Sequence, residues 1–327
     1  MLYVIRWGLV AFAMLGAAFG AAAQSYPDRP VKLVIAFVPG GATDTFARQI
    51  SNELGEALGQ PIIIENRPGA NGYLAWNYVA GADPDGYTLL FAENALGISQ
   101  ALYKKAQSSF DPMKQYDAIA LLAASPSVLI VNNNVPANSV AELVKLAKNT
   151  PQKMNFASAG VGSVAHLSFE VFMAGAGFQA IHVPYKGGGQ AVNDVIAGHV
   201  PMAMTSIQVA RGLVEGGKLK GFAVTSRKRA AVLPNVPTLQ EAGVRVDEVE
   251  LGFWFGLFGP AGLPEPVKAK LDGAVRKVLN DPAVRARLAK LAIEPTYAPA
   301  SVLKTKLANE IANWTKFIDG HNIKPSQ

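Results

Sequence analysis

Two short segments place small residues and hydroxyl groups where a strand is expected to run into a helix. The first loop is Phe37–Asp44, and the second loop is Ser158–Ser163. Glycines let the backbone approach a ligand, and the helix behind each loop offers unpaired N–H groups and a positive dipole end. This chemistry suits an anion such as a carboxylate. For the first loop, the alternative is an ordinary turn in which Thr43 or Asp44 caps the helix.

Other patterns that could indicate a cofactor or a metal are incomplete. Gly160–Ala165 matches G-x-G-x-x-A, but the acidic residue expected about 20 residues later is missing. Gly212–Lys218 approaches a P-loop, but Leu219 stands where Ser or Thr must bind magnesium. The four histidines form no i, i+4 pair, and there are no cysteines. We therefore expect neither a metal nor a cofactor.

Catalysis has no specific signature in this chain. His166 falls in the first turn after the second loop, where we interpret it as a residue that orients the loop and not as a general base. A hydrolase triad of Ser163, His182 and Asp194 remains an alternative that the sequence does not specify.

Short apolar runs alternate with helical patterns. Val31–Phe37 and Pro61–Ile64 read as strands on either side of a helix, which implies a right-handed parallel crossover. Similar strands are expected at Tyr87–Phe91, Ser127–Val131, Met154–Ala157, Ala180–Val183, Met202–Thr205 and Leu219–Thr225, with a helix over Ser139–Lys148. The C-terminal part is helical, and Leu303, Leu307, Ile311, Trp314 and Ile318 share one face. The pattern predicts an α/β fold with parallel sheets, whose ligands bind beyond the carboxyl ends of the strands.

The length of 327 residues suggests two domains. We expect domain 1 to comprise residues 24–124 and 226–327, with the C-terminal helices returning to it, and domain 2 to comprise residues 125–225. The cleft between them is the default pocket. The formal charge is +6, but Lys and Arg are scattered and their densest cluster is Arg227–Arg229, so nucleic-acid binding is not expected.

Residues 1–23 have the features of a secretory signal. Arg6 precedes an apolar run from Trp7 to Phe19, and Ala21–Ala23 offers an A-x-A cleavage site. The alternative is a membrane anchor, but small residues crowd the end of the run and no stop-transfer charges follow. No later stretch reaches the ~18 apolar residues of a membrane helix. The mature chain is expected to be periplasmic.

An ordered set of motifs resembles the substrate-binding receptors of tripartite tricarboxylate transporters, the Bug-type family. The motifs cover essentially the whole mature chain and are Tyr26–Val31, Phe37–Asp44, Glu65–Ala70, Pro84–Leu90, Ser158–Leu167, His182–Gly187, Ala223–Ser226, Leu233–Thr238 and Glu241–Gly243.

This resemblance implies a two-domain periplasmic-binding-protein fold, of the Venus-flytrap kind, that closes on a carboxylate and works with a small and a large membrane subunit. It implies that the two loops hold one carboxylate and that other residues read the rest of the ligand. The resulting candidate ligand residues are Phe37, Pro39, Gly40, Gly41, Thr43, Asp44, Gly72, Tyr73, Asn94, Ser158, Gly160, Gly162, Ser163, His166, Tyr185 and Thr205.

The chain departs from the family pattern at two places. Asn71-Gly72 and the bulky Ala75-Trp76 replace smaller residues, which we expect to reshape the distal pocket, and Ser206 stands near a position that is often acidic. The expected function is a monomeric receptor for a dicarboxylate, amino-acid or aromatic carboxylate, and not an enzyme. A ligand sensor accessory and a hydrolase or isomerase are the alternatives.

Overall fold

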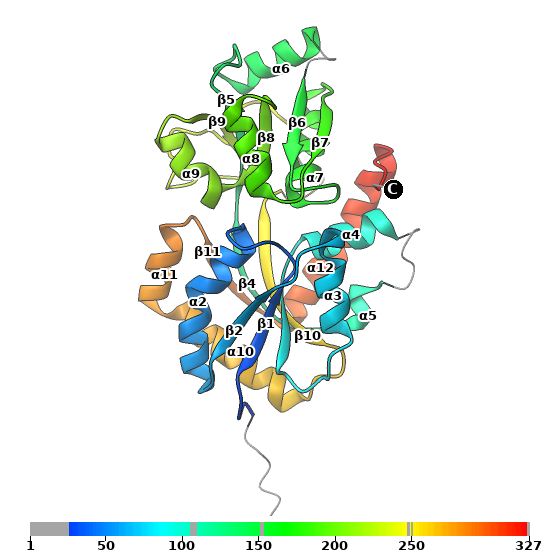
Figure 1. Cartoon of the computed structure of the whole chain (residues 1–327), viewed down its shortest axis with the longest axis vertical. Helices are drawn as coiled ribbons and strands as arrows, with labels where there is room; N and C mark the ends of the chain where they lie inside the picture. Colours follow the sequence, from blue (N-terminus) through cyan, green and yellow to red (C-terminus); the bar gives the residue numbers. More distant parts are fainter. Residues whose placement is uncertain (1–25, 105–109, 151–153, 247–248, 250, 326–327) are drawn as a thin grey trace, which may run out of the picture.

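The computed structural model describes residues 26–104, 110–150, 154–246, 249 and 251–325. The expected signal segment 1–23 lies outside these residues. Two α/β bodies are stacked along the long axis of the molecule (Figure 1), each built on one mixed sheet.

The first sheet has the strand order β11-β4-β10-β3-β1-β2. Its parallel strands are β1 (Val31–Ile35), β2 (Ile62–Asn66) and β3 (Thr88–Glu93). The antiparallel neighbours are β4 (Tyr116–Ser125), β10 (Phe253–Pro260) and β11 (Glu294–Pro299). Because side chains alternate along each strand, Leu33 and Val34 of β1 enter different core clusters.

Helices cover both faces of this sheet. One core cluster packs under α2 (Ala42–Leu58), α10 (Glu265–Asn280) and α11 (Pro282–Ala289). The other packs under α3 (Tyr73–Ala80), α4 (Ala95–Tyr103) and α12 (Ala300–Gly320), with the short η2 (Ala70–Gly72) and α5 (Pro112–Gln115) nearby. In α12, Leu303, Leu307, Trp314 and Ile318 of the expected apolar face are buried and Ile311 is partly buried, and all five pack in this cluster.

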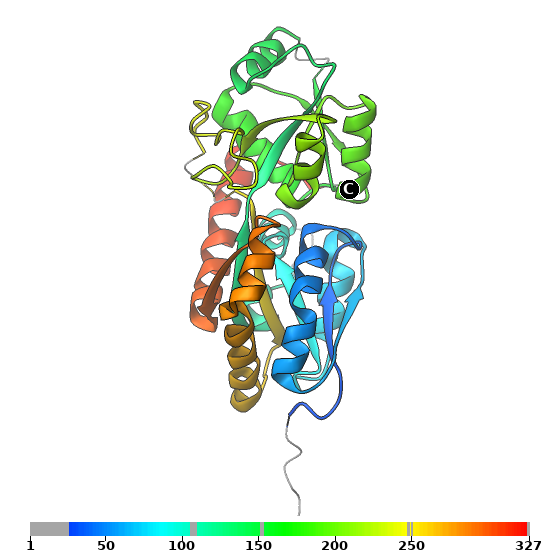
Figure 2. The same ribbon diagram turned by 90° about the vertical axis from the view of Figure 1, so that its left-hand side faces the viewer.

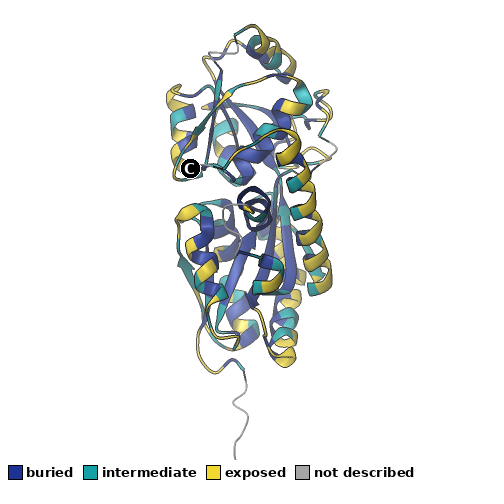
Figure 3. Cartoon of the chain, turned by 90° about the vertical axis from the view of Figure 1, so that its right-hand side faces the viewer, coloured by how far each residue is buried: buried dark blue, intermediate teal, exposed yellow. Residues whose placement is uncertain are grey.

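The second sheet has the order β7-β6-β8-β5-β9. Its strands are β5 (Ser127–Asn132), β6 (Asn155–Ser158), β7 (Ile181–Pro184), β8 (Met202–Ser206) and β9 (Leu219–Val224). Helices α6 (Val140–Asn149) and α7 (Val164–Ala176) pack on one face, and α8 (Gly188–Ala197) and α9 (Ile207–Glu215) pack on the other. Figure 3 shows the buried sheets inside and the exposed helix faces outside.

The expectation of parallel sheets was wrong for part of each sheet. Strands β4, β10 and β11 were not predicted, and β5 pairs antiparallel with both β8 and β9. Buried antiparallel strands are apolar on both faces and therefore resemble buried parallel ones in sequence. The Ala- and Leu-rich β4 also carries residues that favour helices, so only its pairing identifies it as a strand.

The chain returns to the first body later than expected. After β9, residues such as Leu233 and Leu239 pack into the cores of the second body, and Val224 bridges to Thr238. Figure 2 shows these yellow-green loops beside the upper body. The second domain was expected to end near Thr225, whereas Val244 still packs in the core of the second body and Val249 packs in the core of the first.

The two crossings between the bodies lie side by side. Gly252 has a φ of +97°, and a Cβ atom added there would lie 2.8 Å from the Ser125 carbonyl oxygen and 3.2 Å from Thr225 Oγ1. Thr225 Oγ1 accepts a hydrogen bond from the Ser127 N–H at 2.9 Å. Glycine is required at position 252 because its backbone has a left-handed conformation and because the segments at Ser125 and Thr225 approach it closely.

A glycine in α7 provides a test of this packing. A Cβ atom at Gly175 would lie 2.0 Å from the Arg245 carbonyl oxygen, whereas one at Gly212 in α9 meets no atom within 4 Å. Gly175→Ala should therefore lower the free energy of unfolding by about 1–3 kcal/mol through overpacking. Gly212→Ala is the matched control and should be neutral or stabilising by up to ~1 kcal/mol. Urea denaturation measures both, and equal stability of the two variants would contradict the packing of Val244 and Arg245 on α7.

Candidate functional site

Helix N-termini gather where the two bodies face each other. In the first body, α2, α3 and α4 follow the parallel strands β1, β2 and β3. In the second body, α7, α8 and α9 follow the mutually parallel β6, β7 and β8. The carboxyl ends of parallel strands share one sheet edge, so these helices begin along the two facing edges (Figure 1). Six positive dipole ends therefore surround the space where a ligand is expected.

The two loops lie at the boundary between the bodies. A Cβ atom added at Gly187 would lie 3.3 Å from Val38 Cγ2 of the first loop. One added at Gly160 of the second loop would lie 3.5 Å from Asn71 Oδ1, and one at Gly162 would lie 3.0 Å from Leu102 Cδ2. Each loop therefore meets the opposite body, and larger side chains at these glycines would collide across the boundary.

The first loop is fixed by Asp44. Its Oδ2 accepts bonds from the Gly40 N–H and from Arg48 Nε, both at 2.9 Å, and its Oδ1 accepts from Asn66 Nδ2 at 3.0 Å. Burial would raise the pKa of Asp44, but these donors hold it below its usual value. Asp44 is therefore an ionised residue that shapes the loop.

The N-terminus of α2 has no side-chain cap. Its N-cap residue is Gly41, in an extended conformation, and no side chain in the described chain accepts a bond from the first turn. The alternative in which Thr43 or Asp44 caps this helix is therefore not realised, because both lie inside the first turn. Backbone N–H groups at this end can donate to a carboxylate.

The second loop, in contrast, is capped internally. Ser163 Oγ accepts from the His166 N–H at 3.2 Å and donates to the Gly160 carbonyl at 2.7 Å. His166 Nδ1 accepts from the Gly162 N–H at 3.2 Å, so the imidazole holds the loop by its backbone. These bonds fix the second loop within its own body, and across the boundary its glycines face Asn71 and Leu102.

The three residues of the possible hydrolase triad have separate partners. His182 Nε2 lies 2.6 Å from Ser158 Oγ and not against Ser163, and its ring stacks on His166 at 4.0 Å between centroids. Asp194 accepts from the Tyr185 hydroxyl at 2.6 Å and lies 3.5 Å from His199. No nucleophile–base–acid chain of these residues is assembled.

Glu93 is a functional candidate that the sequence analysis missed. It is the last residue of β3, and its Oε2 accepts a bond from the Thr43 hydroxyl. Burial raises the pKa of Glu93 to about 7, although the bond from Thr43 opposes the shift. The available signal was an acid at the end of an apolar strand, next to Asn94.

Several other predicted residues are held by protein contacts. Tyr73 is buried and its hydroxyl donates to the Ser99 carbonyl at 3.3 Å. The Tyr185 hydroxyl is bonded to Asp194, which raises the pKa of Tyr185 to about 12. Thr205 is buried near the end of β8, opposite Val128.

Asn94, Phe37 and Pro39 lie at the edge of the first body. Asn94 Nδ2 donates to the Gly252 carbonyl at 2.9 Å, which ties the start of α4 to the crossing. Its buried Oδ1 has no partner among the described residues. The Phe37 carbonyl accepts from Asn66 Nδ2 at 3.0 Å, and Pro39 is exposed.

The bulky Trp76 lies under the turn that precedes α3. Its side chain is 1% exposed and stacks on Phe110 at 5.5 Å between ring centroids. A Cβ atom at Gly72 would lie 2.5 Å from Trp76 Cζ2, and Gly72 has a φ of +98°. The Trp76 side chain therefore lies in the core, and it leaves no room for a side chain at position 72.

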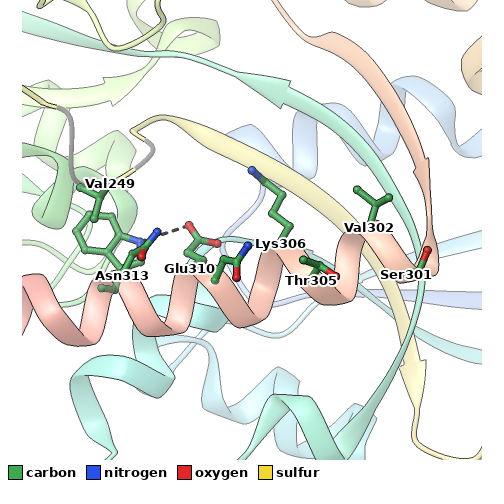
Figure 4. A pocket seen from close by; sticks show the side chains of 9 residues that line it. Val249, Ser301, Val302, Thr305, Lys306, Glu310 and Asn313 are labelled. Atoms are coloured by element: carbon green, nitrogen blue, oxygen red, sulfur yellow. Dashed lines mark hydrogen bonds between the residues drawn. The ribbon is translucent and has the colours of Figure 1, made fainter.

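A separate hollow of about 560 Å³ runs along α12 (Figure 4). Val249, Thr305, Lys306 and Asn313 are among its lining residues, and it includes none of the predicted ligand residues. In the described part of the chain, no helix is long and apolar enough to cross a membrane, and no group of three metal-ligating side chains occurs.

The fold and the paired loops define a two-domain solute-binding protein. The family model for the tripartite tricarboxylate transporter family receptor matches residues 46–323. The chain belongs to this family, as its sequence motifs indicated.

Three solved structures show the same fold. The periplasmic binding protein BugD is 31% identical, with a TM-score of 0.85, and the match covers 92% of this chain and 100% of that chain. Rpa4515 of R. palustris with adipate is 31% identical, with a TM-score of 0.86 and the same coverage. MatC of Rhodopseudomonas palustris with bound malate is 35% identical, with a TM-score of 0.82, over 90% of this chain and 100% of that chain.

The half-buried His182 should make the second body sensitive to acid. Burial, with a contribution from His166, lowers the pKa of His182 from 6.5 to about 3. Below pH 6.5 the unfolded chain takes up this proton before the folded protein does, so stability falls as the pH approaches 3. His182→Phe, which keeps the stacking, should remove up to about 1.4 kcal/mol per pH unit of this fall.

Urea unfolding between pH 7 and pH 4 measures this slope. The matched control is His199→Phe, because the His199 side chain is 71% exposed. An unchanged slope in His182→Phe would contradict the assignment.

Proposed function

We propose that the protein captures one small carboxylate in the periplasm, between the first and second loops, and delivers it to a tripartite tricarboxylate-type membrane transporter. The observation that carries the proposal is the uncapped N-terminus of α2, which lies at the domain boundary. Its unpaired amides and positive dipole end suit a ligand carboxylate. The adipate and malate bound to the two related proteins support this ligand class.

Capture is coupled to domain closure in this proposal. The crossings at Ser125–Ser127 and Gly252 are short, and Asn94 joins one of them directly to the start of α4. Contacts such as that between Gly187 and Val38 form only when the bodies are together. A ligand that touches both loops favours this state by its differential affinity, and the closed monomer then presents one surface to the small and large membrane subunits.

The first experiment is a thermal-shift screen of the ligand-stripped protein against mono-, di- and tricarboxylic, amino and aromatic acids. An acid present at 100 times its dissociation constant should add about 2.7 kcal/mol to the stability. Large shifts with a few related acids that are recovered unchanged would support the receptor. Turnover of the acid would instead favour the hydrolase or isomerase alternative.

Transport and sensing are separated by an uptake assay in cells. Loss of uptake of the bound acid after deletion of the gene supports delivery to a transporter. Unchanged uptake with a lost transcriptional response would favour the sensor alternative.

Gly41→Leu should abolish acid binding while the protein stays folded. Gly41 has a φ of −73°, and an added Cβ atom would meet only the Val38 carbonyl oxygen at 3.6 Å, so the backbone accepts a side chain. The isobutyl group would occupy the space in front of the α2 amides, and affinity should fall by about 100-fold or more. Calorimetric titration with malate and adipate measures this loss.

The matched control is Gly273→Leu in α10, where a Cβ atom meets nothing within 4 Å. This variant should bind as the wild type does. If a folded Gly41→Leu variant kept its affinity for the acid, the proposed site between the two loops would be wrong.

A further inference from the structure

Glu93 is a buried acid at the foot of the first loop. Its residue exposure is 8%, and its carboxylate accepts a hydrogen bond from the Thr43 hydroxyl in the first turn of α2. No ion pair to Glu93 is formed within the described residues. Thr43 is one of the candidate ligand residues, so the carboxyl group lies directly behind the amides that are expected to receive a ligand carboxylate.

The charged groups on the surrounding elements are engaged elsewhere. On α2, Asp44 pairs with Arg48 at 2.9 Å and Glu53 with Arg287 at 2.6 Å, while Lys32 of β1 pairs with Glu65 of β2 at 3.1 Å. On α3, the hydroxyl of Tyr73 bonds to Ser99 and that of Tyr78 to Lys32. The sequences of α4 and β10 contain no charged residue, and the titratable Tyr103 at the end of α4 accepts a bond from Asn71.

Nothing in this environment neutralises Glu93 except a proton. An ionised Glu93 and a ligand carboxylate would share the same helix end, and like charges at a buried site oppose each other. A protonated Glu93 removes this repulsion. Because burial raises the pKa of Glu93 to about 7, both forms exist near neutral pH, and small changes decide between them.

We propose that Glu93 couples carboxylate capture at the first loop to the uptake of one proton. The proton comes from solvent and adds to a carboxylate oxygen of Glu93, so the complex contains the ligand anion and a neutral Glu93. The protein therefore binds its ligand more tightly as the pH falls and releases it more readily as the pH rises. The inference rests on the proposed function and adds a proton-linked residue to the same site.

The test is calorimetric titration of the full mature protein with malate and with adipate at pH 6.5 and pH 8.5, where both acids are dianions. Titrations at pH 7.5 in two buffers of different ionisation enthalpy report the protons taken up on binding. For the wild type we expect affinity about fivefold or more higher at pH 6.5 than at pH 8.5, with net uptake of up to one proton. Glu93→Gln mimics the protonated acid and should abolish both effects, with affinity at pH 8.5 near that of the wild type at pH 6.5.

The matched control is Glu53→Gln, ten residues further along α2 and about 15 Å from Thr43. It removes one carboxylate from the same helix and should keep the wild-type pH dependence. Binding without proton uptake, or an identical pH dependence in Glu93→Gln, would overturn the role of Glu93 and leave the receptor function standing. If neither acid binds at any pH and the wider screen finds no carboxylate, the proposed function fails and this inference fails with it.

Discussion

The unsatisfied donors at the start of α2 are the constraint around which this site is built. A helix begins with N–H groups that have no partner within the helix, and most proteins supply one from a side chain. Here Gly41 occupies the cap position and supplies none. Asp44, the nearest acid, is held by Gly40, Arg48 and Asn66. The helix end is therefore kept open by a loop that is itself well fixed.

The two loops differ in how the backbone donors at their helix N-termini are satisfied. In the second loop, Ser163 and His166 satisfy backbone groups within the protein, which makes that loop rigid before any ligand arrives. The first loop leaves amides for the ligand and has Glu93 behind them. In the proposed function, the open end of α2 donates to a ligand carboxylate, and the internally bonded second loop lies on the other side of the boundary. This arrangement fits a receptor, because binding energy is gained only when both bodies meet.

The two bodies are joined by few covalent connections, which suits the domain closure of the proposed function. In the described part of the chain, two segments link the bodies, and Gly252 lies close to both Ser125 and Thr225. Gln208 of α9 also reaches across, donating to Ser125 Oγ at 2.6 Å and to the Leu291 carbonyl at 2.9 Å. The hydrogen bond from Asn94 to Gly252 links the crossing to the ligand side of the first body.

The local features of this protein can be predicted from the amino-acid sequence. Strand–loop–helix order, the glycines of both loops and the helix that begins after Ser139 follow from residues close together in the chain. Contacts between residues far apart in the chain could not be predicted in this way. The bonds between Thr43 and Glu93 and between Ser158 and His182, the antiparallel β4 and β10, and the packing of residues 233–246 join segments with no shared local pattern. Such pairings depend on which faces meet in space, because side-chain periodicity shows that a face is buried but not what buries it.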